Sequence, residues 1–240
     1  MSKPPEEERR RMVRAPTRGD AAGRGMGQRL RTADERSLSS QQWLNRQLAD
    51  PYVKAAKAHG YRARAAYKLS EIDDRLHLIK RGSKIIDLGC APGGWIQVAL
   101  ERGATDVVGV DLLQVDPIPG ATIIQADFTA PGVPEELMRL LGGTPDIVLS
   151  DMAPNTSGHR ETDHLRIIGL IEVGAEFAMQ VLKPGGTFIA KAFQGGATTE
   201  ILDQLKPAFA RVQHIKPKAS RTDSSEVFLV ATGFRGRKEV

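Results

Sequence analysis

The stretch from Lys84 to Gln97, KIIDLGCAPGGWIQ, limits the possible folds of this 240-residue chain more than any other. Its first residues are apolar and partly β-branched, which predicts a buried strand that ends at Leu88. A glycine-rich loop follows, and then a helical pattern from Trp95 to Glu101. Strand, glycine-rich turn and helix form the first unit of a doubly wound α/β sheet, in which ligands bind beyond the carboxyl ends of the strands.

The glycine loop has the spacing G-x-x-x-G-G, formed by Gly89, Gly93 and Gly94. Glycine allows the backbone to approach a ligand closely or to adopt a positive φ angle. A ligand site is therefore predicted here, although a tight strand-to-helix turn without a ligand would have the same pattern. A dinucleotide site has the spacing G-x-G-x-x-G, so the sequence argues against a nicotinamide-dependent oxidoreductase.

Strands and helices alternate through the rest of the chain. Apolar and β-branched runs predict six further strands, at residues 106–110, 121–125, 146–150, 187–192, 210–215 and 226–231. Helical patterns between them occupy residues 134–141, 160–182 and 198–205. Because the last two strands follow one another without a helix, we expect a seven-stranded, mostly parallel sheet with one antiparallel strand and helices on both faces.

The composition argues against a membrane protein and against a secreted one. No apolar run approaches the ~20 residues of a membrane span, and the charged N-terminus lacks the apolar region of a secretory signal. The single cysteine, Cys90, excludes an internal disulfide and suits a reducing cytosol. The histidines show no metal-ligand spacing. We expect a cytoplasmic protein with no membrane partner and no metal, and take a monomer as the default.

Residues 1–37 are rich in arginine and glycine and poor in apolar side chains. Such a segment cannot bury enough surface to fold alone, so we predict a disordered basic arm. The whole chain has a net charge of +5, which favours a polyanionic partner. The arm either neutralises phosphates or serves as a solubilising tail.

Residues 38–82 predict a helical extension in front of the sheet, with helices at 41–49, 52–59 and 64–76. Basic and aromatic side chains are interleaved in this extension: Lys54, Lys57, Arg62, Arg64, Lys68, Tyr52, Tyr61 and Tyr67. This mixture suits RNA, because phosphates need positive charge and unstacked bases need stacking partners. The alternative is a solvated helix face with the tyrosines in the core.

Three charged residues lie at or inside predicted strands. Asp111 ends the second strand about 20 residues after the glycine loop, where such folds place an acid that accepts hydrogen bonds from ribose hydroxyls. Asp127 follows the third strand, where a carboxylate can accept from an adenine amino group, although either aspartate alone also fits a turn. Lys191 lies inside the fifth strand, and a buried charge is costly unless it is paired. Lys191 is therefore a candidate functional residue, although a lysine that extends to solvent would leave the same pattern.

Six motifs then occur in a fixed order along the chain: DLGCAPGGW, GVDLL, QADF, SDMAPN, LKPGG with KAFQG, and KPKASRTDSSEVFLVA. They resemble the RrmJ/FtsJ family of S-adenosylmethionine-dependent ribose 2′-O-methyltransferases over about residues 41–234. Cys90 stands where alanine is common in that family, which is a small departure. The resemblance implies a Rossmann-like methyltransferase domain at residues 38–240, with its catalytic core at residues 83–234.

The resemblance also assigns a cofactor site for S-adenosylmethionine. Gly89 forms the turn, and Gly93 and Trp95 line the methionine end of the cofactor. Asp111 contacts the ribose of the cofactor and Asp127 its adenine. These roles are expectations that the family's motifs carry onto the matching positions of this sequence.

By the same resemblance, Asp151 lies beside the cofactor and belongs to a catalytic set with Lys68, Lys191 and Glu226. A ribose 2′-hydroxyl holds its proton near neutral pH, so methyl transfer to it gains from a base. We assign Lys191 as the proton acceptor, and Lys68 as the group that steers the substrate and stabilises the developing alkoxide. We assign Asp151 and Glu226 to positioning the two lysines.

Bacterial members of this type modify a uridine in the A-loop of 23S rRNA, which implies the 50S subunit as partner and a role in its maturation. Two alternatives stay open: a transfer-RNA ribose 2′-O-methyltransferase of the same family, and a mainly non-catalytic ribosome-assembly factor. The complete set of four catalytic positions argues against the second alternative.

Overall fold

The structure is a computed structural model that describes residues 49–153, 160–194 and 199–236. The predicted arm at residues 1–37, most of the helix expected at 41–49 and residues 237–240 lie outside the described residues. All seven predicted strands and the other predicted helices are present, with boundaries that shift by a few residues.

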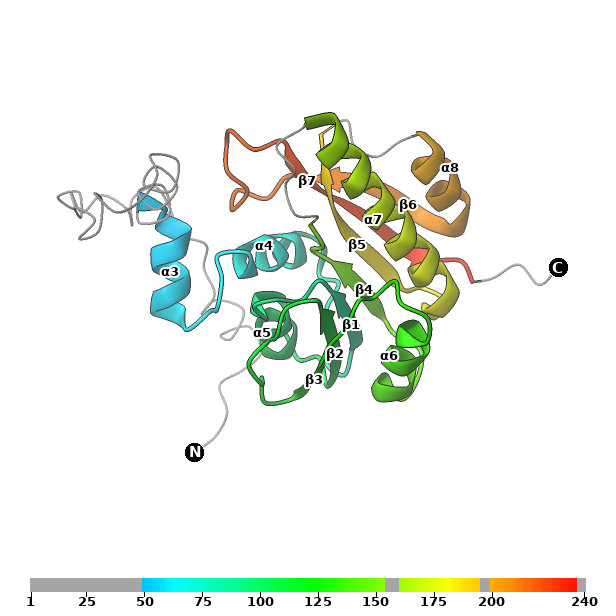
Figure 1. Cartoon of the computed structure of the whole chain (residues 1–240), viewed down its shortest axis with the longest axis horizontal. Coiled ribbons are helices and arrows are strands. Elements are labelled where there is room, and N and C mark those ends of the chain that lie inside the picture. Colours follow the sequence, from blue (N-terminus) through cyan, green and yellow to red (C-terminus); the bar gives the residue numbers. More distant parts are fainter. Residues whose placement is uncertain (1–48, 154–159, 195–198, 237–240) are drawn as a thin grey trace.

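A single sheet forms the centre of the described chain (Figure 1), with the strand order β3-β2-β1-β4-β5-β7-β6. Its strands are β1 Lys84–Leu88, β2 Asp106–Asp111, β3 Ala121–Gln125, β4 Ile147–Ser150, β5 Thr187–Phe193, β6 Phe209–Ile215 and β7 Glu226–Phe234. Strand β7 is antiparallel to both of its neighbours, and the other neighbouring pairs are parallel, as predicted. The strand order reverses at β1, so the switch point of the sheet lies where the glycine loop begins.

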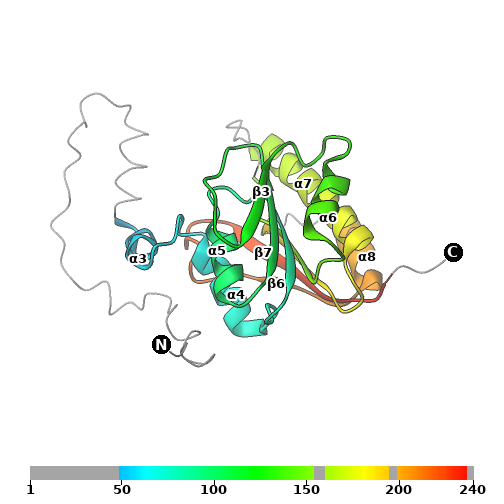
Figure 2. The same ribbon diagram turned by 90° about the horizontal axis from the view of Figure 1, so that it is seen from below.

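Helices cover both faces of this sheet (Figure 2). One face carries α6 Val133–Leu141, α7 Arg160–Val181 and α8 Thr199–Ala208, and the other carries α4 Ala66–Leu76 and α5 Gly94–Glu101. Helix α3 Pro51–His59 contacts α4 at the margin of the second layer. None of the helices within the described ranges is long and apolar enough to cross a membrane.

Local sequence sets both ends of α3. The Asp50 side chain accepts a hydrogen bond from the Tyr52 backbone N–H at 3.0 Å, and Pro51 occupies the first turn, where its missing N–H costs nothing. At the other end Gly60 adopts a φ of 76°, a left-handed conformation that glycine accepts readily. The helix is thus fixed as a short unit in front of the sheet.

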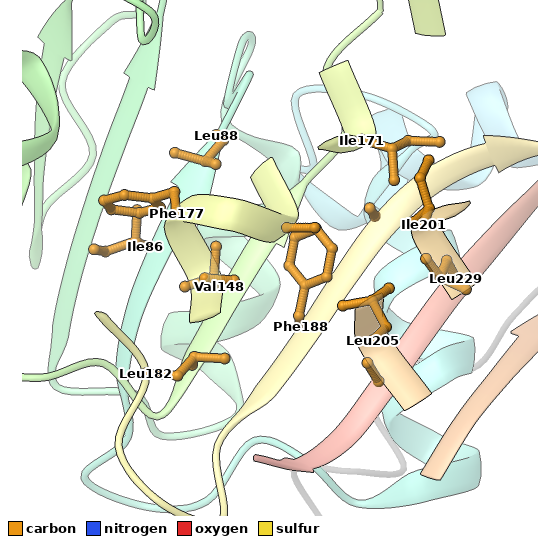
Figure 3. Close-up of a cluster of buried hydrophobic side chains, with 14 of the residues drawn as sticks. Ile86, Leu88, Val148, Ile171, Phe177, Leu182, Phe188, Ile201, Leu205 and Leu229 are labelled. Atoms are coloured by element: carbon orange, nitrogen blue, oxygen red, sulfur yellow. The ribbon is translucent and has the colours of Figure 1, made fainter. Parts of the chain in front are cut away.

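Apolar side chains fill the space between the sheet and each helical layer. In Figure 3, Ile86 of β1 and Val148 of β4 lie near Phe177 of α7, and Leu205 of α8 lies near Leu229 of β7. Burial of each such side chain stabilises the fold by roughly 1.5–3 kcal/mol. Both faces of the central strands are buried, which explains why these strands have continuous apolar runs rather than alternating ones.

The antiparallel strand β7 begins at the edge of the sheet where the parallel strands end. Parallel strands β1, β4 and β5 end at Leu88, Ser150 and Phe193. Because β7 runs the other way, its first residue, Glu226, pairs with Phe193 at this same edge. The carboxyl ends of β1, β4 and β5 and the start of β7 therefore lie at the same edge of the sheet.

Candidate active site

Two positions of the glycine loop are packed too closely against the rest of the protein to carry a side chain. At Gly89 the φ angle is 75°, and an added Cβ would lie 2.7 Å from Cγ of Met152 and 2.9 Å from its backbone nitrogen. At Gly93 the φ angle is 105°, and a Cβ would lie 2.5 Å from Ile118. Glycine is required at both positions for conformation and for close approach.

Two further predicted cofactor residues, Trp95 and Asp111, lie at this loop. Trp95 is buried, and its Nε1 donates to the Ala65 carbonyl oxygen at 2.8 Å. Asp111 accepts from the backbone N–H of Ala91 and of Leu113, each at 2.8 Å, so it joins the glycine loop to the end of β2. This geometry puts Trp95 and Asp111 at the glycine loop, as predicted from sequence.

Asp127 lies farther out, after β3. Its Oδ1 accepts from the Thr129 hydroxyl at 2.7 Å and the Thr129 backbone N–H at 2.9 Å, and these hydrogen bonds lower the pKa of Asp127. The carboxylate is exposed to solvent and ionised near neutral pH. It is thus available as a hydrogen-bond acceptor at the end of the third strand.

Lys191 is paired rather than extended to solvent. Its Nζ donates to Oδ1 and to the backbone oxygen of Asp151, both at 2.9 Å. The Lys191 side chain is 11 % exposed and that of Asp151 is 18 % exposed. A strand lysine with this little exposure needs such a partner, and the neighbouring strand β4 supplies it.

Lys68 forms a second pair with a carboxylate from β7. Its Nζ donates to Oε2 of Glu226 at 2.7 Å, and the Ser220 hydroxyl donates to Oε1 at 2.7 Å. Burial opposes ionisation of Glu226, but the charge of Lys68 and these hydrogen bonds outweigh it, so the pKa of Glu226 is lowered. Glu226 is therefore a carboxylate that holds Lys68 in place.

The two pairs form one cluster around Phe228. Lys191 is the register partner of Phe228 across β5 and β7, and Nζ of Lys68 lies 5.7 Å from the centroid of the Phe228 ring. The charge of Lys191 also acts on Glu226. The structure thus brings together all four side chains of the predicted catalytic set, from α4, β4, β5 and β7.

The basic extension differs from the sequence prediction in its aromatic residues. Tyr61 and Tyr67 are buried, so the prediction that they stack on RNA bases is wrong. Their rings pack against one another at a centroid distance of 5.5 Å, and their hydroxyls pair with Glu101 and His59. The alternative, tyrosines in the core, holds for these two residues, which are buried in the apolar cluster between the sheet and α3, α4 and α5.

Two arginines of the extension also have structural partners. Arg62 donates to the carbonyl oxygens of Pro92, Asp116 and Pro117 at 3.1, 2.6 and 2.9 Å. Its guanidinium thereby ties the glycine loop to the loop after β2. Arg64 donates to Asp50 and to the Ala219 carbonyl oxygen. Lys54 and Lys57 on α3 are exposed, so they remain the extension's candidates for phosphate contacts.

Sequence reasoning missed Asp87, which lies in β1 below the glycine loop. Asp87 is fully buried, and neither carboxyl oxygen has a hydrogen-bond partner among the described residues. With Gly89 and Asp151 it lines a narrow pocket at the loop, here called the glycine-loop pocket. Burial, and then the charges of Asp151 and Asp111, raises the pKa of Asp87 well above its usual range. The argument used for Lys191, a charge inside an apolar strand, would have found it.

This buried carboxyl predicts a specific pH dependence of stability. The native state keeps a proton on Asp87 at pH values where the unfolded chain, with a pKa near ~3.9, has lost it. Its contribution to the free energy of unfolding is therefore present at low pH and falls as pH rises, by up to about 1.4 kcal/mol per pH unit. Asp87→Asn removes this contribution, so the variant gains stability relative to the wild type as pH increases.

Urea unfolding of both proteins without ligand at several pH values between ~4.5 and ~8 measures this difference. Groups that titrate equally in the two proteins cancel in the comparison. Parallel stability curves over the whole range would show that Asp87 titrates normally.

Comparison with known proteins identifies the chemistry of this site. A family model described as FtsJ-like methyltransferase matches residues 61–234. This chain belongs to the FtsJ-like methyltransferase family. Its cofactor is therefore S-adenosylmethionine. The match includes the glycine loop and all four residues of the lysine–carboxylate cluster.

Individual proteins agree with the family assignment. Relatives from Caulobacter vibrioides and Caulobacter sp. strain K31, both named Ribosomal RNA large subunit methyltransferase E, are 64% and 63% identical over 94% of this chain and 100% of theirs. A crystal structure described as a ribosomal RNA methyltransferase from Plasmodium falciparum is 35% identical, with a TM-score of 0.66, and the match covers 74% of this chain and 100% of that one.

The glycine-loop pocket fits S-adenosylmethionine by its chemistry. Gly89 and Gly94 line it without a side chain, and Asp87 presents a carboxyl without a partner among the described residues. A cofactor that carries an ammonium and a sulfonium group suits a pocket lined by two acids, Asp87 and Asp151. Within the described residues no cluster of histidine, cysteine, aspartate or glutamate could hold a metal ion.

Proposed function

We propose that this FtsJ-like methyltransferase methylates a ribose 2′-hydroxyl of large-subunit ribosomal RNA. The observation that carries the proposal is the cluster formed by Lys191–Asp151 and Lys68–Glu226 beside the glycine-loop pocket. Methyl transfer to a hydroxyl gains from a group that takes its proton and from a group that stabilises charge on its oxygen. The two lysines supply both.

Lys191 accepts the proton of the 2′-hydroxyl. S-adenosylmethionine supplies a methyl group on a positively charged sulfur. A lysine acts as a base only in its neutral form, and in the structure Nζ of Lys191 donates to Asp151. Lys68 stabilises the negative charge that develops on the ribose oxygen. Asp151 and Glu226 hold the two amino groups at fixed positions, which aligns the reacting atoms.

The cofactor residues take their roles from their places around the glycine loop. Gly89 and Gly93 provide close approach at the methionine end, where Trp95 forms a wall. Asp111 binds the ribose of the cofactor, and Asp127 accepts from its adenine amino group. Asp87, below the loop, faces the positive end of the cofactor.

The substrate follows from the relatives. Proteins 64% and 63% identical to this chain are named for the ribosomal RNA of the large subunit. Together with the motif resemblance, this supports a uridine in the A-loop of 23S rRNA as the target and the 50S subunit as the partner. We place the protein in the cytoplasm with the ribosomes, as a monomer that supports 50S maturation.

Residues 38–82 act as the RNA-binding extension, and the basic arm at residues 1–37 adds contacts to phosphates. Lys54 and Lys57 project from α3 as exposed cations. Phosphate contacts release counterions, so RNA affinity should fall as salt concentration rises.

Transfer of tritium from labelled S-adenosylmethionine tests the function. Acceptors are 50S subunits and free 23S rRNA from a strain without this protein, together with transfer RNA. We expect label on 50S, mapped to one ribose of the A-loop. Label on transfer RNA alone would move the substrate to the alternative within the family. Cofactor binding without transfer to any acceptor would favour the assembly-factor alternative.

A further inference from the structure

A second cavity adjoins the Lys68–Glu226 pair of the lysine–carboxylate cluster. It has a volume of about 320 Å³, and Arg64, Lys68, Arg221, Asp223, Ser224 and Glu226 are among its lining residues. We call it the arginine pocket. It shares no lining residue with the glycine-loop pocket, which contains Asp151. Members of the proposed catalytic cluster thus line two separate pockets, one with two aspartates and one with two arginines.

Hydrogen bonds fix one wall of the arginine pocket before any ligand binds. Arg64 donates to the Ala219 carbonyl oxygen and ties the segment before β7 to the start of α4. Within that segment the Ser224 backbone N–H donates to the Arg221 carbonyl oxygen at 3.1 Å, which closes a turn. Arg221 is therefore held on a short, ordered turn next to Glu226.

Arg221 has spare hydrogen-bonding capacity. In the described part of the chain its only polar side-chain contact joins Nε to Oδ2 of Asp50 at 3.6 Å, which is longer than a hydrogen bond. The side chain is 35% exposed. Both terminal nitrogens of its guanidinium are therefore available, and a guanidinium binds phosphate oxygens in a bidentate manner.

The acidic residues of the pocket do not cancel this charge. The charge of Glu226 is offset by that of Lys68, and its other oxygen accepts a hydrogen bond from Ser220. Asp223 is exposed to solvent, where salt and water screen its charge. Asp50 forms its closer ion pair with Arg64. Of the two arginines, Arg221 therefore has the weaker contact with an acidic side chain.

The chemistry of RNA determines what must lie beside Lys68. A ribose 2′-carbon is bonded to the 3′-carbon, which carries the phosphodiester to the next nucleotide. If the proposed function holds, a 2′-oxygen placed at Lys68 and Lys191 brings this phosphate within a few ångströms. We propose that Arg221, supported by Arg64, binds the phosphodiester on the 3′ side of the methylated nucleotide.

Steady-state kinetics of Arg221→Ala with 50S subunits test this site. Loss of a charge-assisted contact should raise KM for the RNA about 10-fold or more, with a smaller change in kcat and an unchanged Kd for S-adenosylmethionine. The slope of log Kd for RNA against log salt should fall by about one. Arg221→Lys should restore part of the affinity and the full salt slope, because it keeps the charge without the bidentate geometry.

Arg139→Ala is the matched control, because Arg139 is an exposed arginine of α6 that pairs with Glu136; its KM should equal that of the wild type. Equal KM and salt slope for Arg221→Ala and wild type would overturn the proposal. A raised KM with an unchanged salt slope would also overturn it, since that pattern indicates a structural role. A wild type that transfers no methyl group to any RNA would instead refute the proposed function itself.

Discussion

Lys191→Ala should lower the rate of methyl transfer by about 10²–10⁴-fold, the contribution of a general base, while S-adenosylmethionine still binds. Lys191 lies inside β5 and contacts Asp151 through both a side-chain and a backbone oxygen. Single-turnover transfer to 50S subunits measures the rate, and equilibrium binding of labelled cofactor measures the retained affinity.

Lys191→Arg separates the role of a base from that of a charge. Arginine can keep the ion pair with Asp151, but it does not lose its proton near neutral pH, so this variant should be as slow as Lys191→Ala. Lys183→Ala is the control, because Lys183 pairs with Asp146 in the turn before the same strand, and an exposed pair of this kind contributes ~0–1 kcal/mol. Turnover of Lys191→Arg at the wild-type rate would remove Lys191 from proton transfer.

Gly89→Ala should cost about 3 kcal/mol or more of the free energy of unfolding and weaken cofactor binding. The alanine would have to adopt a φ near 75°, and its Cβ would meet the backbone of Met152 at 2.9 Å. A backbone neighbour cannot rotate away as the end of a side chain can. Since Met152 follows Asp151, relief of the clash displaces Asp151 and with it the partner of Lys191.

Gly60→Ala provides the comparison for the backbone strain alone. Gly60 has a φ of 76°, and an added Cβ would have no neighbour within 4 Å, so this variant should lose only about 1–2 kcal/mol. Urea unfolding and cofactor binding of both variants isolate the steric part. If the two variants lose equal free energy of unfolding and both bind the cofactor normally, the close contact between Gly89 and Met152 contributes to neither stability nor cofactor binding.

The sequence predicted the strands, and it named most of the residues that the structure brings together at the candidate site. Apolar, β-branched runs located β1, β2 and β4, and the isolated charge in β5 identified Lys191. Motif order then supplied Lys68 and Glu226, which are 158 residues apart in sequence yet form a hydrogen bond. No periodicity argument alone could have paired these two residues.

The errors arose where one residue type serves two environments. Tyr67 and Tyr61 lie among cations in the sequence, which suggests base stacking, but the layer of α3, α4 and α5 buries them instead. Arg62 similarly looked like a phosphate ligand, whereas its guanidinium binds three carbonyl oxygens. Which side of a short helix meets the sheet depends on tertiary packing that the local sequence does not encode.

Asp87 and Arg221 illustrate what only the structure reveals. The sequence places Asp87 in a strand, but not that its oxygens lack partners among the described residues. Arg221 is one of many arginines, and only its position on the turn before β7 separates it from those with full sets of contacts.

The late position of β7 also has a consequence for protein synthesis. Strand β7 fills the place between β5 and β6 in the sheet and delivers Glu226 to Lys68. A growing chain that has not yet emerged through β7 therefore has no complete sheet and no partner for Lys68. Such an unfinished chain lacks the Lys68–Glu226 pair, so the proposed activity can begin only when translation of the domain is nearly complete.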